Sequence, residues 1–244
     1  NPATEAARLL TTHITTVTDR YRGRILSYDV VNETVMEDST LAQTAISRAI
    51  GGTEALVDLA FQTARAQLPD AQLVYNDYMS WEPGNEKHRA GVLKLLEGFR
   101  ARGVPVDALG IQSHIRIDTY DPSTGTGPRQ EREWRKFLDE VVAMNYDILI
   151  TEFDVNDQAL PGDISARDRS VADYAKAYFE VMLDYPQLKD VLAWGMCDSY
   201  SWLQEFKPLR TDGLAKRACP YSADFAPKPL HSKLAAALQT ASAR

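Results

Sequence analysis

The stretch ILITEFDV at residues 148–155 is an apolar, β-branched run that leads into the carboxylate of Glu152. A second stretch, SYDVVNET at residues 27–34, has the same form and leads into Asn32 and Glu33. Short runs of this kind are typical of strands buried on both faces. A parallel α/β barrel has its chemistry at the carboxyl ends of its strands, where both glutamates are predicted to lie. Two carboxyl groups that meet across a site are what glycosidic bond cleavage requires.

Strand and helix patterns alternate along the chain, which predicts a parallel sheet with right-handed crossover connections. Strands are expected at residues 25–31, 72–77, 107–113, 147–152 and 190–196. Helices are expected at residues 3–20, 54–68, 86–102, 130–144, 166–184 and 228–240, with Thr53 as the N-cap of the second. Residues 34–52 are expected to form a loop or a short helix. The pattern contains no linker, so we expect residues 1–244 to form a single catalytic domain.

The composition excludes several classes of function. A net charge of −7 without a basic cluster argues against nucleic-acid binding. The sequence has no apolar run of about 18 residues, so no membrane span is expected. The four histidines lack metal-ligand spacing, and we expect neither a metal nor another cofactor. Cys197 and Cys219 fit two free thiols and a disulfide of an exported protein about equally well.

Six motifs follow one another along the chain: DVVNE at 29–33, NDY at 76–78, GIQSH at 110–114, TEFD at 151–154, WGMCDSYSW at 194–202 and PKP at 227–229. Together they resemble glycoside hydrolase family 10, the endo-β-1,4-xylanases, over almost the whole chain. The resemblance implies a TIM-type (β/α)8 barrel that hydrolyses β-1,4-xylosidic bonds in xylan and xylo-oligosaccharides with retention. We expect such an enzyme to be secreted or periplasmic.

The resemblance also assigns the catalytic residues. In this family the acid/base follows the fourth strand and the nucleophile follows the seventh, which gives these roles to Glu33 and Glu152. The family pattern implies contacts from Asp154 through His114 to Glu152, in which His114 orients the nucleophile. The alternative for His114 is a histidine that has only a structural role in the core.

Other residues are expected to support the acid or to bind sugar. Gln112 would meet the acid, and Asp29 would support it from beneath. The expected sugar-binding residues are Asn32, Asn76, Tyr78, Trp81, Trp194 and Trp202. Asn32 would donate to the sugar 2-hydroxyl, and the last two tryptophans would form an apolar wall at the cleaved sugar. Structural roles are the alternatives for Asp29 and the two asparagines, such as a turn-forming asparagine at a strand end for Asn32, and a place in the core is the alternative for Trp194 and Trp202.

The five expected strands correspond to the fourth to eighth strands of the family. The domain would therefore lack three N-terminal strand–helix units and the sugar-binding residues that they carry. Three explanations fit the missing units. The sequence could be a piece of a longer enzyme, a second polypeptide could complete the barrel, or a truncated chain could self-associate. We favour the first. An incomplete sheet exposes two edges, which favours aggregation or pairing. Because every catalytic residue is present but half of the sugar cleft is missing, a non-catalytic xylan-binding or assembly fragment is an alternative function. A related β-1,4-glucanase is another.

Overall fold

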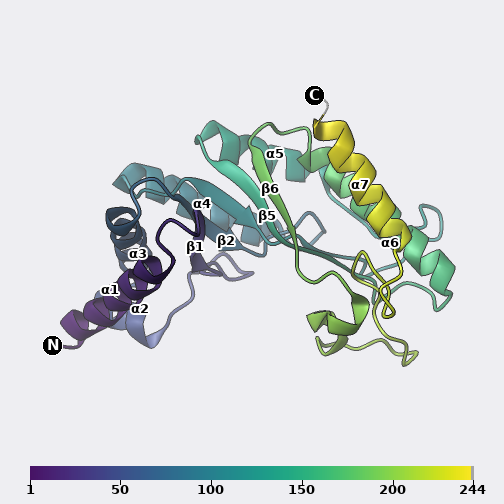
Figure 1. The fold of residues 1–244 in the computed structure, drawn as a ribbon, viewed down its shortest axis with the longest axis horizontal. Helices are drawn as coiled ribbons and strands as arrows, with labels where there is room; N and C mark the ends of the chain where they lie inside the picture. Colours follow the sequence, from purple (N-terminus) through teal and green to yellow (C-terminus); the bar gives the residue numbers. More distant parts are fainter. Residues whose placement is uncertain (243–244) are drawn as a thin grey trace. The chain divides into compact units, whose positions relative to one another are not determined.

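The computed structural model describes residues 1–242, and the chain forms two compact units (Figure 1). The first unit comprises residues 1–79, 85–111 and 136–149, and the second comprises the remaining described residues. Elements of the first unit are α1 (Pro2–Tyr21), β1 (Ser27–Asn32), α2 (Ala45–Ile50), α3 (Thr53–Gln67), β2 (Gln72–Asp77), α4 (Glu86–Arg102) and β3 (Ala108–Ile111). The second unit contains β4 (His114–Arg116), α6 (Ile164–Met182), β6 (Leu188–Ala193), η1 (Asp198–Tyr200), η2 (Trp202–Gln204) and α7 (Pro229–Ser242). Both units contain part of α5 (Glu131–Ala143) and of β5 (Asp147–Asn156).

The strands of the first unit are parallel, as the alternating pattern predicts. β1 pairs with β2 and β2 with β3, in a register that sets Asn32 opposite Asn76. β2 is buried along almost its whole length. The expectation of burial on both faces is wrong for β1, whose residues are half-buried or exposed. The physical reason is its place at the end of the strand order, which makes it an edge strand within residues 1–242.

Local sequence signals predicted one helix end correctly and another incorrectly. The predicted helix at 86–102 has the same bounds in the structure, where Gly103 ends α4 in the left-handed conformation (φ +67°). The prediction that Thr53 caps α3 is wrong, because Thr53 is the first helical residue and Gly52 occupies the N-cap position. The Thr53 hydroxyl instead donates to the carbonyl of Ala42 at 2.5 Å, which fastens α3 to the preceding loop.

The second unit contains a strand that the sequence pattern did not predict. Ser113 has φ +63° and separates β3 from β4, whereas the predicted strand covered residues 107–113 and ended before β4 begins. β4 pairs in parallel with the end of β5, with His114 opposite Asp154 and Arg116 opposite Asn156. This extra pairing extends β5 four residues beyond its predicted end. β6 also pairs with β5, and α7 lies along α6 (Figure 1).

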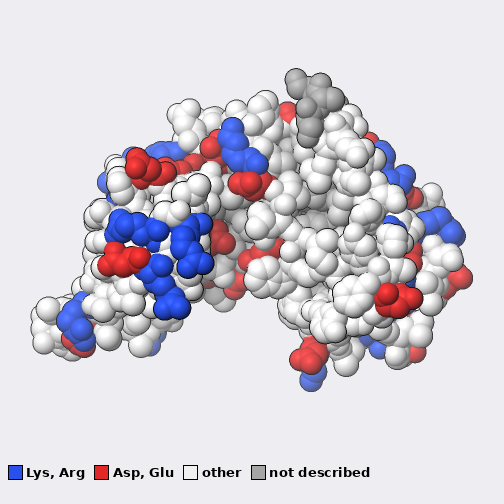
Figure 2. All heavy atoms as spheres, in the orientation of Figure 1, with Lys and Arg blue, Asp and Glu red and all other residues white. Residues whose placement is uncertain are grey.

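The surface carries charges of both signs. On the face drawn in Figure 2, cationic and anionic side chains lie close to one another. Exposed ion pairs such as Arg102 with Glu54 at 3.1 Å contribute to this mixture. Among residues 1–242, no helix combines the length and the hydropathy that crossing a bilayer requires.

Candidate active site

The carboxyl end of β5 carries a chain of three titratable side chains. Glu152 and Asp154 are two residues apart and so point to the same face of the strand. β4 places His114 directly opposite Asp154. The Nδ1 atom of His114 lies 2.9 Å from Asp154 Oδ1, and its Nε2 atom lies 3.1 Å from Glu152 Oε2. These are the contacts that the family resemblance implies, while the orienting role of His114 stays a prediction.

The protonation of His114 follows from these contacts. Burial lowers the pKa of His114, but the hydrogen bonds and negative charges of Asp154 and Glu152 outweigh it and raise the pKa to about 9. At neutral pH the ring is therefore an imidazolium that donates from both nitrogens. Its positive charge partly compensates the two carboxylates, and each of its two nitrogens contacts one of them.

Trp202 binds the other oxygen of the buried carboxylate. Its Nε1 atom donates to Asp154 Oδ2 at 2.7 Å, and its ring lies edge-on to His114 with centroids 5.0 Å apart. Trp202 is 37% exposed and Trp194 is 50% exposed, so part of each indole reaches solvent, as stacking on a sugar requires. The backbone N–H of Trp194 donates to Phe153 O at 3.0 Å, which fixes the end of β6 against β5. The sugar-binding roles of both residues stay predictions.

The segment before His114 is buried and conformationally constrained. Ser113 has a positive φ, and its hydroxyl lies 2.8 Å from the hydroxyl of Tyr178. Gln112 is also buried, and its carbonyl accepts the N–H of Glu152 at 3.0 Å. The backbone around His114 is thus held from two sides. The expected contact of the Gln112 side chain with Glu33 stays a prediction.

Glu33 is positioned by its backbone. It has φ +55°, a left-handed conformation that is uncommon outside glycine and costs on the order of 1–3 kcal/mol. Its N–H donates to Asn76 O at 2.9 Å, which holds the residue against β2. A bulge at Val30 interrupts the β1 register just upstream, and bulges of this kind re-aim the side chains that follow. Strained backbone is typical of functional positions, which agrees with the predicted importance of Glu33.

A buried polar network holds the segment that follows this glutamate. The hydroxyl of Thr34 donates to that of Tyr75 at 2.8 Å, and the Tyr75 hydroxyl forms a short hydrogen bond with Asp77. Asp77 is fully buried and also binds the N–H of Tyr78 at 2.8 Å and Nε2 of His88 at 3.0 Å. The sequence pattern did not reveal this network. The one local signal was the spacing of Tyr75 and Asp77, which places both side chains on one face of β2.

Asn76 is buried and holds Asn32. Its Nδ2 atom donates to Asn32 Oδ1 at 2.9 Å, across the pair of strands that the register sets side by side. Gly110 makes room for this side chain, because a Cβ there would clash with Asn76 Oδ1. Burial favours the structural alternative for Asn76, whereas Asn32 is exposed and its sugar contact stays a prediction.

The structure corrects the expectation for Trp81. Its side chain is 0% exposed and packs against the rings of Tyr174 and Tyr178, with centroids 5.1 and 5.0 Å apart. A buried indole presents no face to a sugar, so Trp81 is a core residue in this structure. The NDY motif is followed closely by a tryptophan, and sequence position alone did not reveal that the chain turns inward there.

Tyr78 and Asp29 lie in the first unit with Glu33. Tyr78 is partly exposed, and burial together with the negative charge of Asp77 raises its pKa, with further contributions from Glu37 and Glu33. Asp29 is exposed and lies on β1 just before the bulge. Its support of Glu33 and the sugar contact of Tyr78 stay predictions.

The two cysteines are buried free thiols and do not form a disulfide. The Cys197 thiol lies 3.1 Å from Ser222 O, and burial raises the pKa of Cys219 to about 12. Residues 1–242 contain no group of three side chains suited to hold a metal ion.

The parallel α/β fold and the carboxylates at its strand ends define the class of barrel glycoside hydrolases. The chain belongs to glycosyl hydrolase family 10, whose family model matches residues 1–237. It has the α/β TIM-barrel fold of that family, as the six motifs predicted.

Relatives and solved structures agree with this assignment. The chain is 31% identical to endo-1,4-β-xylanase B of Thermotoga neapolitana over 229 residues, which are 93% of this chain and 60% of the relative. It is 30% identical to endo-1,4-β-xylanase 3 of Hypocrea jecorina over 98% of this chain and 59% of the relative. The crystal structure of xylanase 10B from Thermotoga maritima superimposes with a TM-score of 0.84 at 28% identity, over 99% of this chain and 69% of that one. The chain thus spans about 60% of the length of these two curated relatives.

Proposed function

We propose that this protein hydrolyses internal β-1,4-xylosidic bonds of xylan by a retaining double displacement. The observation that carries the proposal is the chain from Asp154 through His114 to Glu152, because it supplies an oriented carboxylate at a strand end. The similar relatives named above are endo-1,4-β-xylanases. A further similar structure, xylanase 10B of Thermotoga petrophila at 28% identity, is a complex with xylobiose.

In the proposed reaction, a Glu152 oxygen attacks the anomeric carbon while Glu33 gives its proton to the leaving glycosidic oxygen. A covalent xylosyl-enzyme ester forms, and the aglycone departs as an alcohol. Glu33 then takes a proton from water, whose oxygen attacks the same carbon and releases Glu152. The mechanism requires the two carboxyl groups to lie about 5–5.5 Å apart, and this spacing stays a prediction.

The exposed polar and aromatic residues have proposed roles in holding the sugar. Asn32 donates to the 2-hydroxyl, a contact that strengthens in the transition state. Trp194 and Trp202 offer indole faces to the C–H faces of the pyranose rings. His114 does not touch sugar in this proposal, because its two nitrogens already bind carboxylates.

Incubation with xylan and with carboxymethylcellulose tests the proposal. New reducing ends from xylan alone are the expected result. Preference for the cellulose derivative would favour a β-1,4-glucanase instead. Because the chain spans only about 60% of these two relatives, a non-catalytic xylan-binding or assembly fragment is the second candidate. Binding to insoluble xylan without release of reducing ends would support that candidate.

A further inference from the structure

The loop between β6 and α7 carries Trp202, and it has little regular structure of its own. Residues 198–217 contain two single-turn 3₁₀ helices, η1 and η2, and no strand. Trp202 nevertheless reaches the buried carboxylate of Asp154 at 2.7 Å. A loop of this kind takes its position from contacts with neighbouring elements. The contacts that anchor it therefore decide where the indole lies.

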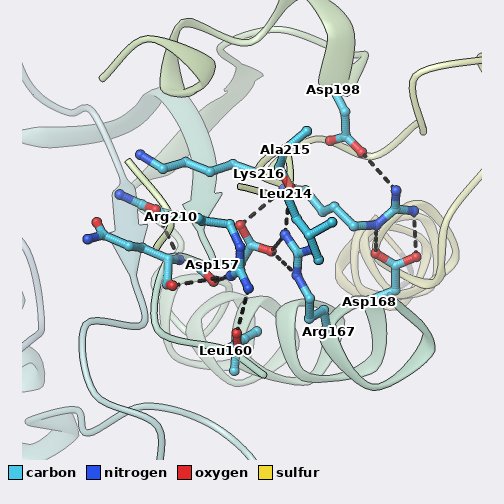
Figure 3. A network of polar contacts seen from close by, with 12 residues as sticks. Asp157, Leu160, Arg167, Asp168, Asp198, Arg210, Leu214, Ala215 and Lys216 are labelled. Carbon is cyan, nitrogen blue, oxygen red and sulfur yellow. Dashed lines mark hydrogen bonds and ion pairs between the residues drawn. The ribbon is translucent and has the colours of Figure 1, made fainter. Parts of the chain in front are cut away.

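Arg210 fastens this loop to the chain just after β5 (Figure 3). Its guanidinium donates to the carbonyl oxygens of Asp157 at 2.8 Å, Gln158 at 3.2 Å and Leu160 at 2.9 Å. The Arg210 side chain is only 3% exposed, and Asp212 binds the same guanidinium from within the loop. One planar cation therefore holds three carbonyls in a fixed fork geometry, which the compact ammonium group of a lysine does not reproduce.

Asp157 provides a second anchor at the same place. Its Oδ1 atom accepts the N–H of Arg217 at 3.0 Å, and its Oδ2 atom accepts from Arg167 at 2.8 and 2.5 Å. Arg167 also donates to the carbonyl of Ala215 at 2.7 Å, as Figure 3 shows. Asp157 and Arg167 are both buried. Their ion pair therefore connects the end of β5 with α6 and the loop at a place that solvent does not reach.

Both anchors therefore act on the strand end that carries the candidate nucleophile. Glu152 and Asp154 belong to β5, and Asp157 follows the last residue of that strand. We propose that Arg210, with the Asp157–Arg167 pair, positions Trp202 against Asp154 and through it orients His114 and Glu152. These are positioning residues, since they lie behind the candidate site. Their consequence for catalysis rests on the proposed function, whereas their effect on Trp202 does not.

Proton exchange at the Trp202 indole tests this directly. The chain has four tryptophans, and Trp202→Phe identifies the signal of Trp202 in a proton–nitrogen NMR spectrum. In Arg210→Lys we expect the Trp202 indole proton to exchange about tenfold faster with solvent, because the loop opens locally. The indole signals of the buried Trp81 and Trp134 act as internal references and are expected to keep their exchange rates.

Two further variants complete the test. Asp212→Asn removes one partner of Arg210 at a side chain that is 35% exposed, and we expect a smaller acceleration in a protein that still folds. Arg135→Lys alters exposed ion pairs on α5 and is the matched control, with no expected change at Trp202. Unchanged exchange of the Trp202 indole in both Arg210→Lys and Asp212→Asn would overturn the proposal. The measurement needs no substrate, so a failure to hydrolyse xylan would contradict the proposed function alone.

Discussion

The two candidate catalytic glutamates, one within its strand and one directly after its strand, are supported in different ways. Glu152 belongs to a buried strand, and its side chain contacts His114, which in turn contacts Asp154. Glu33 follows an exposed edge strand, and a bulge, a left-handed backbone conformation and a network behind the next residues position it. The contrast suggests that charge fixes the proposed nucleophile, whereas backbone geometry aims the proposed acid. The predictions below separate these two kinds of support.

Removal of the proposed nucleophile should have the largest effect. Glu152→Ala is expected to lower the rate of xylan hydrolysis by roughly 10⁴-fold or more, because no covalent intermediate can form. Glu97→Ala, which removes an exposed carboxylate on α4, is the control and should keep full activity. Near-normal hydrolysis by Glu152→Ala would show that another group attacks the sugar.

The effect of removing the proposed acid should depend on the leaving group of the substrate. Glu33→Ala is expected to hydrolyse xylan roughly 10²–10⁴-fold more slowly than the wild type. It should keep much of its activity on aryl xylobiosides, because their leaving groups need little protonation. Added azide should accelerate this variant and yield the β-glycosyl azide, because azide attacks the xylosyl-enzyme from the open face. Formation of only the α product would mean that the reaction does not proceed with retention.

The charge on His114 should make stability depend on pH. Its pKa of about 9 in the folded protein lies above its ordinary value of 6.5, so the folded protein binds the proton of His114 more tightly than the unfolded chain does. The stabilisation is fully present below pH 6.5 and is lost as the pH rises through about 9. At about 1.4 kcal/mol per pKa unit, the loss is about 3 kcal/mol. Urea unfolding of the wild type and of His114→Gln across this range measures it, and an equal pH dependence in both proteins would refute the assignment.

The backbone support near Glu33 should respond to a single methyl group. Gly110→Ala is expected to destabilise the protein by about 1–3 kcal/mol, since the new Cβ would clash with Asn76 and lie 3.0 Å from Val74 Cγ1. Gly98→Ala is the matched control in the helix α4, because its Cβ would meet only the guanidinium of Arg102, which forms exposed ion pairs with Asp58 and Glu54. There the gain in helix propensity of about 0.5–1 kcal/mol is offset by the shift of these exposed pairs, so we expect stability to change by less than about 1 kcal/mol. Thermal unfolding of both variants measures these changes in stability. A Gly110→Ala protein with the stability of the wild type would show that Asn76 has room to move.

Local sequence patterns predicted most elements of the fold but not their tertiary surroundings. The apolar spacing and Gly103 defined α4, because a helix stripe and a C-cap are local features. β4 escaped prediction because it is a three-residue, largely polar segment beyond the predicted strand, and it forms by pairing with the distant end of β5. The exposure of β1 depends on which strand lies beside it, and this information is not contained in residues 27–32.

The same limit applies to the candidate site. The family motifs located Glu33, Glu152, His114 and Asp154, and the structure places the last three in contact. The motifs did not reveal that Trp81 is buried, or that Asp77 and Arg210 hold the segments behind the site. The contacts of Trp81 with Tyr174 and of Arg210 with Asp157 join residues far apart in the chain, so no local spacing encodes them.

Covalent trapping of the nucleophile tests the central claim most directly. A 2-fluoro xylobioside with a good leaving group forms its ester with a retaining enzyme but hydrolyses it slowly, because fluorine destabilises the positively charged transition state. Intact mass followed by peptide mapping then locates the attached sugar. We expect one 2-fluoroxylobiosyl group, attached to Glu152. Attachment to any other residue, or an unlabelled protein that still hydrolyses xylan, would contradict the account.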